Sequence, residues 1–288
     1  STLFGAMQAG RIQILSTSAG VGVNLNAATL QATNIDVTAD QIAIRGKVTQ
    51  STVKDSHSHT NWWNWGRAGR EYLDIDETDT RQTMTRSQLN ASGNLTLTAN
   101  ATLNVGAADL NGQSVDLSGN TVALETESTT DTYRYFYRDA INLWSYQKTE
   151  NRDSTTQHGA RVTAGQQLSL DAMQNANLIG AQLSSAGDAR VTAGNDLVLM
   201  AAVNTSAGAV VVKEVNKTII NNSASNTSYN NQSLVVSSVT ASGDLALDAA
   251  HDVNLNAAKL QSGGDSLLSA GGVVVVDAQS FTTAQSAS

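Results

Sequence analysis

The stretch Val23-Asn-Leu-Asn-Ala-Ala-Thr-Leu30 returns three more times along this chain of 288 residues. The later copies are Leu103-Asn-Val-Gly-Ala-Ala-Asp-Leu110, Ala176-Asn-Leu-Ile-Gly-Ala-Gln-Leu183 and Val253-Asn-Leu-Asn-Ala-Ala-Lys-Leu260. The copies begin about 75 residues apart, and a regular period of this kind indicates an array of stacked units rather than one closed core.

Around each copy, apolar residues alternate with polar ones, which is the period of a β-strand. Corresponding apolar pairs recur after about 20 residues, as from Leu95 and Leu97 to Val115 and Leu117. That length fits one turn, or rung, of a parallel β-helix with three short strands. The crossover rule makes such a coil right-handed. The sequence therefore predicts an all-β fold, a right-handed parallel β-helix over residues 1–288, as a single segment of a longer protein.

Glycines followed by Asn or Asp punctuate the rungs, at Gly119, Gly194 and Gly243. We expect these glycines to form corners with positive φ. Small aliphatic side chains, with Ala at the inward corners, would fill a narrow interior.

The recurrence of apolar pairs after about 20 residues is interrupted in three segments, at about residues 51–88, 125–161 and 213–236. Polar and apolar residues still alternate within them, so each is predicted to leave the coil as a β-hairpin and to return. Aromatic residues gather in the first two segments, and ten of them are our candidates for interaction: Trp62, Trp63, Trp65, Tyr72, Tyr133, Tyr135, Phe136, Tyr137, Trp144 and Tyr146.

Composition excludes several classes of protein. The formal net charge of −8 argues against nucleic-acid binding, which needs a basic footprint. The absence of Cys excludes disulfides and Cys-based zinc sites. No apolar stretch is long enough for a transmembrane helix, and the amino terminus lacks the pattern of a signal peptide.

Several phrases carry a resemblance to a known family. Residues 91–99 read Ala-Ser-Gly-Asn-Leu-Thr-Leu-Thr-Ala and are echoed at 164–172 and 241–249, while Thr60-Asn-Trp-Trp-Asn-Trp-Gly66 holds a Trp-Trp pair. With the Gly-Ala-x-Leu phrase, they make the chain resemble the haemagglutinin repeats of filamentous haemagglutinin and of CdiA-type contact-dependent inhibition proteins. The third segment departs from the family pattern because it lacks Trp.

The resemblance implies a secreted, bacterial cell-surface protein exported through an outer-membrane two-partner-secretion transporter. Its Trp-containing excursions resemble the family's later repeat region, which helps to deliver an effector across the target cell's outer membrane. The expected role is therefore structural and interactive, in a contact-dependent growth inhibition toxin. An adhesin rod that binds host or bacterial glycans or receptors is the alternative, and self-association through the end rungs stays open.

Catalytic and metal chemistry has weaker support. Asp55, His57 and His59 have the spacing of an incomplete Zn²⁺ or Ni²⁺ site. The acidic run from Asp74 to Asp79 lacks the glycines of a Ca²⁺ loop, so we expect a solvated edge offset by Arg81 and Arg86. His158 and His251 look isolated and solvent-facing. We therefore expect no metal and no cofactor.

A β-helical polysaccharide-active enzyme is the third possible class. It would require acids such as Asp131, Asp139 and Glu150 to converge over a groove. Acids within the rungs, such as Asp188 and Asp244, have the positions of turn residues instead, so we do not expect an enzyme.

The aromatic segments leave three interpretations open. The rings could pack over the side of the rod and shield strand edges. They could form an exposed surface that binds proteins or stacks on sugar rings. They could also contact a membrane, because Trp and Tyr gather at bilayer interfaces.

Overall fold

The computed structural model describes residues 2–3, 5–16, 18–62, 70–141, 144–216, 221–280 and 283–287. Strands occupy most of these residues and no helix occurs among them, so the predicted all-β class is confirmed. The described part of the chain accordingly offers no helix long and apolar enough to cross a membrane.

Three parallel ladders of strands form a coil, which the chain winds through in the order first, second, third. The first ladder contains β1 (Thr2–Leu3), β4 (Gly22–Asn26), the second half of β6 (Asn34–Arg45), the second half of β10 (Asn94–Gly106), the start of β12 (Thr121–Ile141), β15 (Ala176–Ile179), β18 (Leu197–Met200), β23 (Val253–Asn256) and β26 (Val274–Asp277). This is the strand arrangement of a parallel β-helix.

The other two ladders complete each rung. The second contains β2 (Ala6–Gln8), β5 (Thr29–Ala32), β9 (Ser87–Ala91), the first half of β11 (Ala108–Gly119), the first half of β14 (Arg161–Ala172), β16 (Gln182–Ser185), β21 (Ser237–Ala241) and β24 (Ala258–Ser262). The third contains β3 (Arg11–Leu15), the remaining halves of β6, β10, β11 and β14, then β17 (Asp188–Ala193), β22 (Leu245–Ala249) and β25 (Ser266–Ala270).

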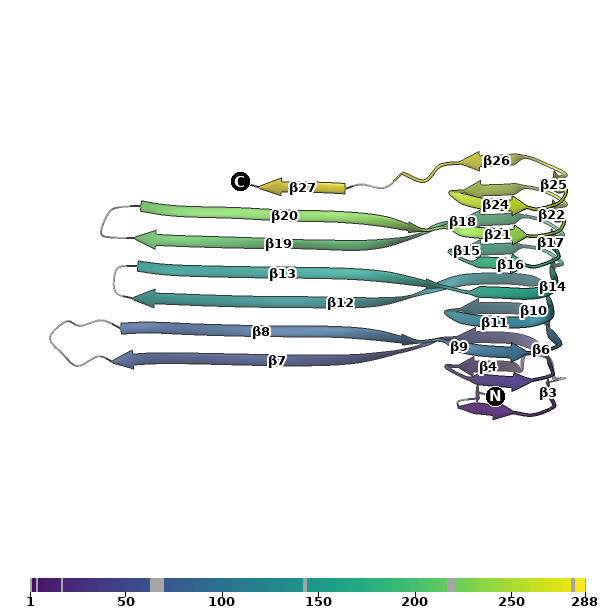
Figure 1. The fold of residues 1–288 in the computed structure, drawn as a ribbon, viewed down its shortest axis with the longest axis horizontal. Coiled ribbons are helices and arrows are strands. Elements are labelled where there is room, and N and C mark those ends of the chain that lie inside the picture. Colours follow the sequence, from purple (N-terminus) through teal and green to yellow (C-terminus); the bar gives the residue numbers. More distant parts are fainter. Residues whose placement is uncertain are drawn as a thin grey trace.

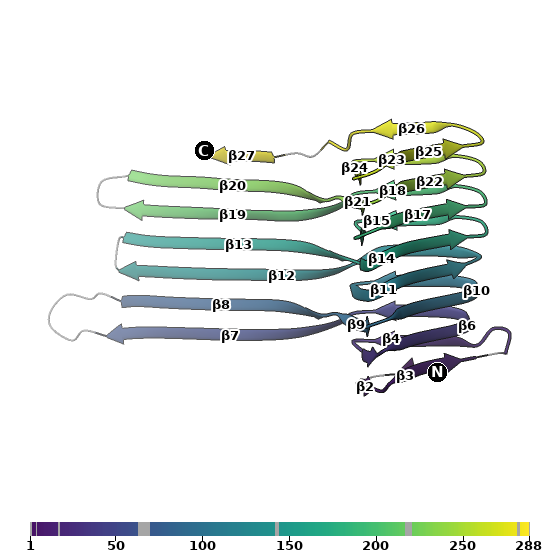
Figure 2. The same ribbon diagram turned by 45° about the vertical axis from the view of Figure 1, so that its right-hand side comes forward.

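A second, antiparallel sheet extends to one side of the coil (Figure 1, Figure 2). We call it the flanking sheet, and its strands in spatial order are β7 (Lys47–Trp62), β8 (Arg70–Thr85), β12, β13 (Trp144–Gly159), β19 (Ala202–Asn216), β20 (Asn221–Val235) and β27 (Thr283–Ala287). The pairs β7–β8, β12–β13 and β19–β20 leave the coil between the first and second ladders. The last pair begins at residue 202, which is earlier in the chain than residue 213, the predicted start of the third excursion.

The repeated phrase forms the tight corner between the first and second ladders. Its fifth residue has a left-handed backbone in every copy: φ is 46° at Ala27, 45° at Ala107, 60° at Gly180 and 48° at Ala257. From Ala27 onwards, a tight corner alternates with a long antiparallel strand pair in successive rungs.

Side chains on both sides of this corner fill the coil. Leu25, Ala28 and Leu30 are fully buried in the first copy, and the same positions recur along the core. Burying each Leu contributes about 1.5–3 kcal/mol. Asn24 and Asn254, between the buried positions, are exposed.

The corner glycines act differently from our prediction. Gly119, Gly194 and Gly243 are not among the residues with positive φ, so that expectation is wrong. A Cβ at Gly194 would overlap the carbonyl oxygen of Met173 in the rung below, and one at Gly243 would overlap a carboxylate oxygen of Asp188. These positions therefore require glycine because successive rungs approach closely.

Acidic residues at the corners link one rung to the next. A carboxylate oxygen of Asp188 accepts a hydrogen bond from the backbone N–H of Asp244 (2.9 Å), and Asp244 accepts one from Asp265 (2.8 Å). These acids serve as turn residues, as their positions in the sequence indicate.

Candidate interaction surface

Cross-strand register sets which side chains share a face of the flanking sheet. One row of directly paired residues crosses all seven strands: Val53, Asp79, Tyr133, Arg152, Gly208, Tyr229 and Gln285. Directly paired residues of antiparallel strands lie on the same face. We call the face that carries this row the tyrosine face.

The tyrosine face holds five of the ten predicted aromatic residues, which contact one another. The rings of Tyr133 and Tyr135 are stacked with centroids 6.4 Å apart. Tyr146 meets Tyr137 edge-on at 5.8 Å and stacks with Trp144 at 6.4 Å. The register therefore gathers aromatic residues from both strands of one pair.

The remaining candidates lie elsewhere. Tyr72 pairs with Ala140, and Phe136 alternates with the tyrosines of β12, so both belong to the opposite face. Trp62 ends β7. Trp63 and Trp65 lie outside the described residues.

Charged groups interleave with the aromatic rings. The Glu150 side chain is only 8% exposed, and it pairs with Lys148 (2.9 Å) and with Arg152. The hydrogen bond from Lys148 lowers the pKa of Glu150. The Lys148 ammonium lies 5.6 Å from the centroid of Tyr135, and the Arg152 guanidinium lies 5.5 Å from that of Tyr133. These cation–π contacts and ion pairs stiffen the β12–β13 pair.

This arrangement bears on the enzymatic alternative. Asp131 and Glu150 both line a groove, but Asp139 does not. The pKa of Glu150 is lowered, whereas a general acid working near neutral pH needs a raised one. The three predicted acids therefore do not all converge over the groove, and the lowered pKa of Glu150 makes it unsuited to act as a general acid.

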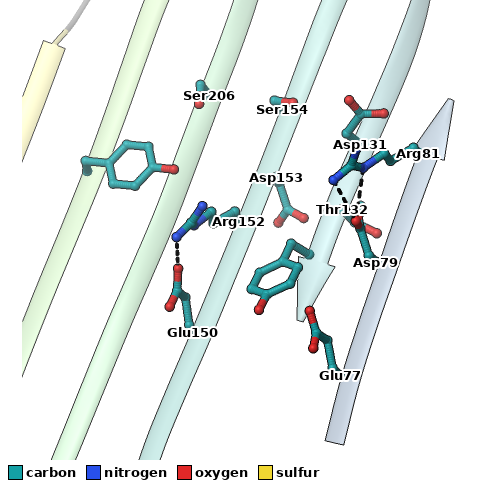
Figure 3. Close-up of a pocket in the computed structure, with 12 residues that line it drawn as sticks. Glu77, Asp79, Arg81, Asp131, Thr132, Glu150, Arg152, Asp153, Ser154 and Ser206 are labelled. Carbon is teal, nitrogen blue, oxygen red and sulfur yellow. Dashed lines mark hydrogen bonds and ion pairs between the residues drawn. The ribbon is translucent and has the colours of Figure 1, made fainter. Parts of the chain in front are cut away.

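The groove spans all three strand pairs (Figure 3) and has a volume of about 570 Å³. Its lining residues are Glu77, Asp79, Arg81, Asp131, Thr132, Tyr133, Glu150, Arg152, Asp153, Ser154, Ser206 and Tyr229. Sequence reasoning did not identify Arg152, Ser206 or Tyr229, because only the register between neighbouring strand pairs brings them together.

The structure places the predicted His57 and His59 on β7 and the acidic run from Asp74 to Asp79 on the neighbouring β8. His57 Nδ1 lies 2.8 Å from a carboxylate oxygen of Asp55. In the register between β8 and β12, Asp74 lies directly across from Arg138 and Asp76 directly across from Phe136. Both acids therefore lie on the face of the sheet opposite to that of Glu77 and Asp79, and the acidic run does not converge on one point. Asp79 pairs with Arg81 as expected (2.9 Å).

Our expectation that His158 and His251 are isolated is wrong. His158 Nε2 lies 2.9 Å from the Thr129 hydroxyl, and burial is the main cause of its lowered pKa. His251 is exposed, but its Nδ1 lies 2.9 Å from Asp196 and 3.3 Å from Asp252. Those three residues could offer ligand atoms to a metal, since the atoms lie within 4.8 Å of one another.

Arg86 also differs from expectation, because it anchors the sheet to the coil instead of offsetting the acidic run. Its guanidinium pairs with Asp109 (2.9 Å) and donates to the carbonyl oxygens of Ala108 (2.9 Å) and Gly159 (2.7 Å). On the neighbouring pair, Glu127 accepts from Gly46 N–H (2.9 Å). The root of the sheet is therefore fixed by half-buried charged groups.

Parallel ladders with one repeated corner define the chain as a repeat protein of the β-helical type. Family models described as the haemagglutinin repeat match residues 5–61, 66–131 and 143–209. The chain therefore belongs to the haemagglutinin-repeat family.

Two curated relatives share this sequence along nearly its whole length. The chain is 28% identical to a hemolysin of Proteus mirabilis over 94% of its residues, and 27% identical to a hemolysin of Serratia marcescens over 99%. It spans only 17% and 18% of those proteins. No solved structure matches the chain at a significant level.

Proposed function

We propose that this chain is a structural and interaction segment of a large secreted protein of the bacterial surface. Membership of the haemagglutinin-repeat family and the two hemolysin relatives support export by an outer-membrane partner transporter. The parallel coil would act as a right-handed spacer. Each new rung could pair with the one before it as the chain emerges, so folding would need no globular intermediate.

The flanking sheet is the part that we assign to target contact. Aromatic residues gather towards its far end, where Ile141 and Trp144 are directly paired and are 42% and 37% exposed. Tyr72, in the neighbouring β8, is 41% exposed. Trp and Tyr favour the interface between lipid and water. This gathering is the observation that carries the proposal of contact with the target cell's outer membrane.

Intrinsic fluorescence offers a direct test. The four Trp of the chain are Trp144 and the cluster at 62, 63 and 65, which lies at the end of β7 and in the connection to β8. We expect phospholipid vesicles to shift the Trp emission to shorter wavelength and brominated lipid to quench it. Unchanged emission with saturating vesicles would contradict membrane contact.

We propose two alternative consequences of membrane contact, delivery of an effector and damage to a membrane. The resemblance to contact-dependent inhibition proteins favours help in delivering an effector, whereas the relatives' name favours damage to a membrane. Full-length protein with Tyr72, Trp144 and Tyr146 replaced by Ser should still be exported, but should lose most delivery or lysis. Val53→Ser, at an exposed position nearer the coil on the same sheet, is the matched control.

An adhesin would give the opposite result. If the triple variant loses attachment to target cells while delivery or lysis per attached cell is unchanged, the segment binds a surface receptor or glycan instead. Assays of attachment and of delivery in the same culture separate the two functions.

A further inference from the structure

The groove on the tyrosine face has the geometry of a ligand site in the middle part of the flanking sheet. Gly208 lies in the middle of its central row, between Arg152 on β13 and Tyr229 on β20. A Cβ at Gly208 would lie 2.6 Å from the Tyr229 ring, so the ring covers this glycine. Tyr133 and Tyr229 lie three strands apart, which is about 14 Å. An elongated ligand of two or three small rings fits that span.

Several polar groups in the groove have no partner among the described residues. They are the hydroxyl groups of Ser154, Ser206 and Tyr229, for which the structure contains no side-chain hydrogen bond. Figure 3 shows Ser154 and Ser206 side by side on neighbouring strands. Each hydroxyl can donate one hydrogen bond and accept others. Such a row suits a ligand that carries hydroxyl groups of its own.

The groove also contains unneutralised negative charge. Asp79 is paired with Arg81, Glu150 with Lys148 and Arg152, and Asp153 with Arg134. Glu77 and Asp131 have no cationic partner in the described part of the chain: burial and the nearby Glu77 raise the pKa of the Tyr133 hydroxyl, and Asp131 accepts from Gln82 N–H (2.8 Å). Like-charge repulsion therefore disfavours anionic ligands, and a cationic group gains from these carboxylates.

We propose that this groove binds a saccharide that carries primary amines. The sugar hydroxyls would bond the free Ser and Tyr hydroxyls, and a ring face would lie against Tyr229, whose negative face attracts polarised C–H groups. The ammonium groups would lie near Glu77 and Asp131. The proposal is independent of membrane contact by the far end of the sheet, since the groove lies nearer the coil.

A matched pair of probes tests it: a trimer of β-1,4-linked glucosamine and the same trimer with every amine acetylated. Titration calorimetry at about pH 6, where the amines are charged, should show the free-amine trimer binding at least about tenfold more tightly. Added salt should weaken this binding. Glu77→Gln with Asp131→Asn should abolish the difference, because each amide keeps the shape and an acceptor oxygen.

Control measurements keep the proposal falsifiable. Glu214→Gln removes an exposed carboxylate of the same face outside the groove and should leave binding unchanged. Ser206→Ala should weaken binding without changing the unfolding midpoint. Equal binding of the acetylated trimer, equal binding of spermidine or trilysine, or no binding of the amine trimer at millimolar concentration would each overturn the proposal.

Discussion

The hydroxyl group of Ser87 lies 2.6 Å from the carbonyl oxygen of Arg45, although the strand pair β7–β8 separates the two residues in the chain. Ser87 thus closes the base of the pair, and its oxygen also accepts from the N–H of Ala28 (3.1 Å). Ser237 repeats the contact at the base of β19–β20, where it lies 2.6 Å from the carbonyl oxygen of Met200 and 2.8 Å from that of Leu178. A buried hydroxyl therefore satisfies corner carbonyls at two of the three bases.

Replacing Ser237 by Ala should lower the free energy of unfolding by about 1–3 kcal/mol, because the carbonyl oxygens of Leu178 and Met200 lose the one hydroxyl donor that they share and the N–H of Ala181 loses an acceptor. Ser242→Ala, at an exposed position, is the matched control and should change it by less than about 0.5 kcal/mol. Urea unfolding followed by circular dichroism measures both. Equal stability of the two variants would mean that another donor replaces the hydroxyl.

Gly194→Ala should destabilise the coil by about 1–3 kcal/mol, because the added methyl group meets the carbonyl oxygen of Met173 and forces the rungs apart. Gly10 also lies in the coil, but a Cβ there would meet no atom within 4 Å. Gly10→Ala should therefore be neutral or slightly stabilising. A loss of stability in both variants would point to backbone flexibility, rather than rung contact, as the reason for these glycines.

The coil was predictable because its apolar pairs repeat with the strand period and the rung length. The same reasoning misassigned the corners: Ala27, Ala107 and Ala257 adopt positive φ, while the conspicuous glycines serve close packing. Residue type alone does not separate these two uses of a corner. The groove was not predictable because Tyr229 and Arg152 share one row only through the register between two separate strand pairs.

Glu150→Gln should destabilise the flanking sheet, since it removes the ion pairs with Lys148 and Arg152 from a side chain that is almost fully buried. The expected loss is about 1.5–3 kcal/mol at neutral pH. The pKa of Glu150 is lowered in the folded protein, so its contribution is present above the ordinary value of 4.5 and is lost as the pH falls below it.

Comparison with Glu214→Gln makes this test specific, because Glu214 is exposed on the same face. Unfolding free energies of the two variants should differ at pH 7 and converge as the pH is lowered. A difference that persists in strong acid would indicate lost packing rather than lost charge.

His158 should make stability depend on pH in a different range. Its folded pKa is lowered by burial and by Arg86 and Arg161, so the unfolded chain takes up a proton first as the pH falls below about 6.5. The free energy of unfolding should therefore decrease from pH 7.5 towards pH 5. His158→Gln should remove that part of the decrease, and an unchanged pH profile in this variant would contradict it.

Because tight corners alternate with long strand pairs, the spacing of the rungs in the coil matches the spacing of the strands in the flanking sheet. Neighbouring rungs are about 4.8 Å apart, and so are neighbouring strands of a sheet. A strand pair that emerges at every second rung therefore has the width of two strands available, and it occupies that width completely. A pair at every rung would be crowded, and a pair at every third would leave a gap. The smallest length by which this protein can grow or shrink with its second sheet continuous is thus two rungs together with one strand pair.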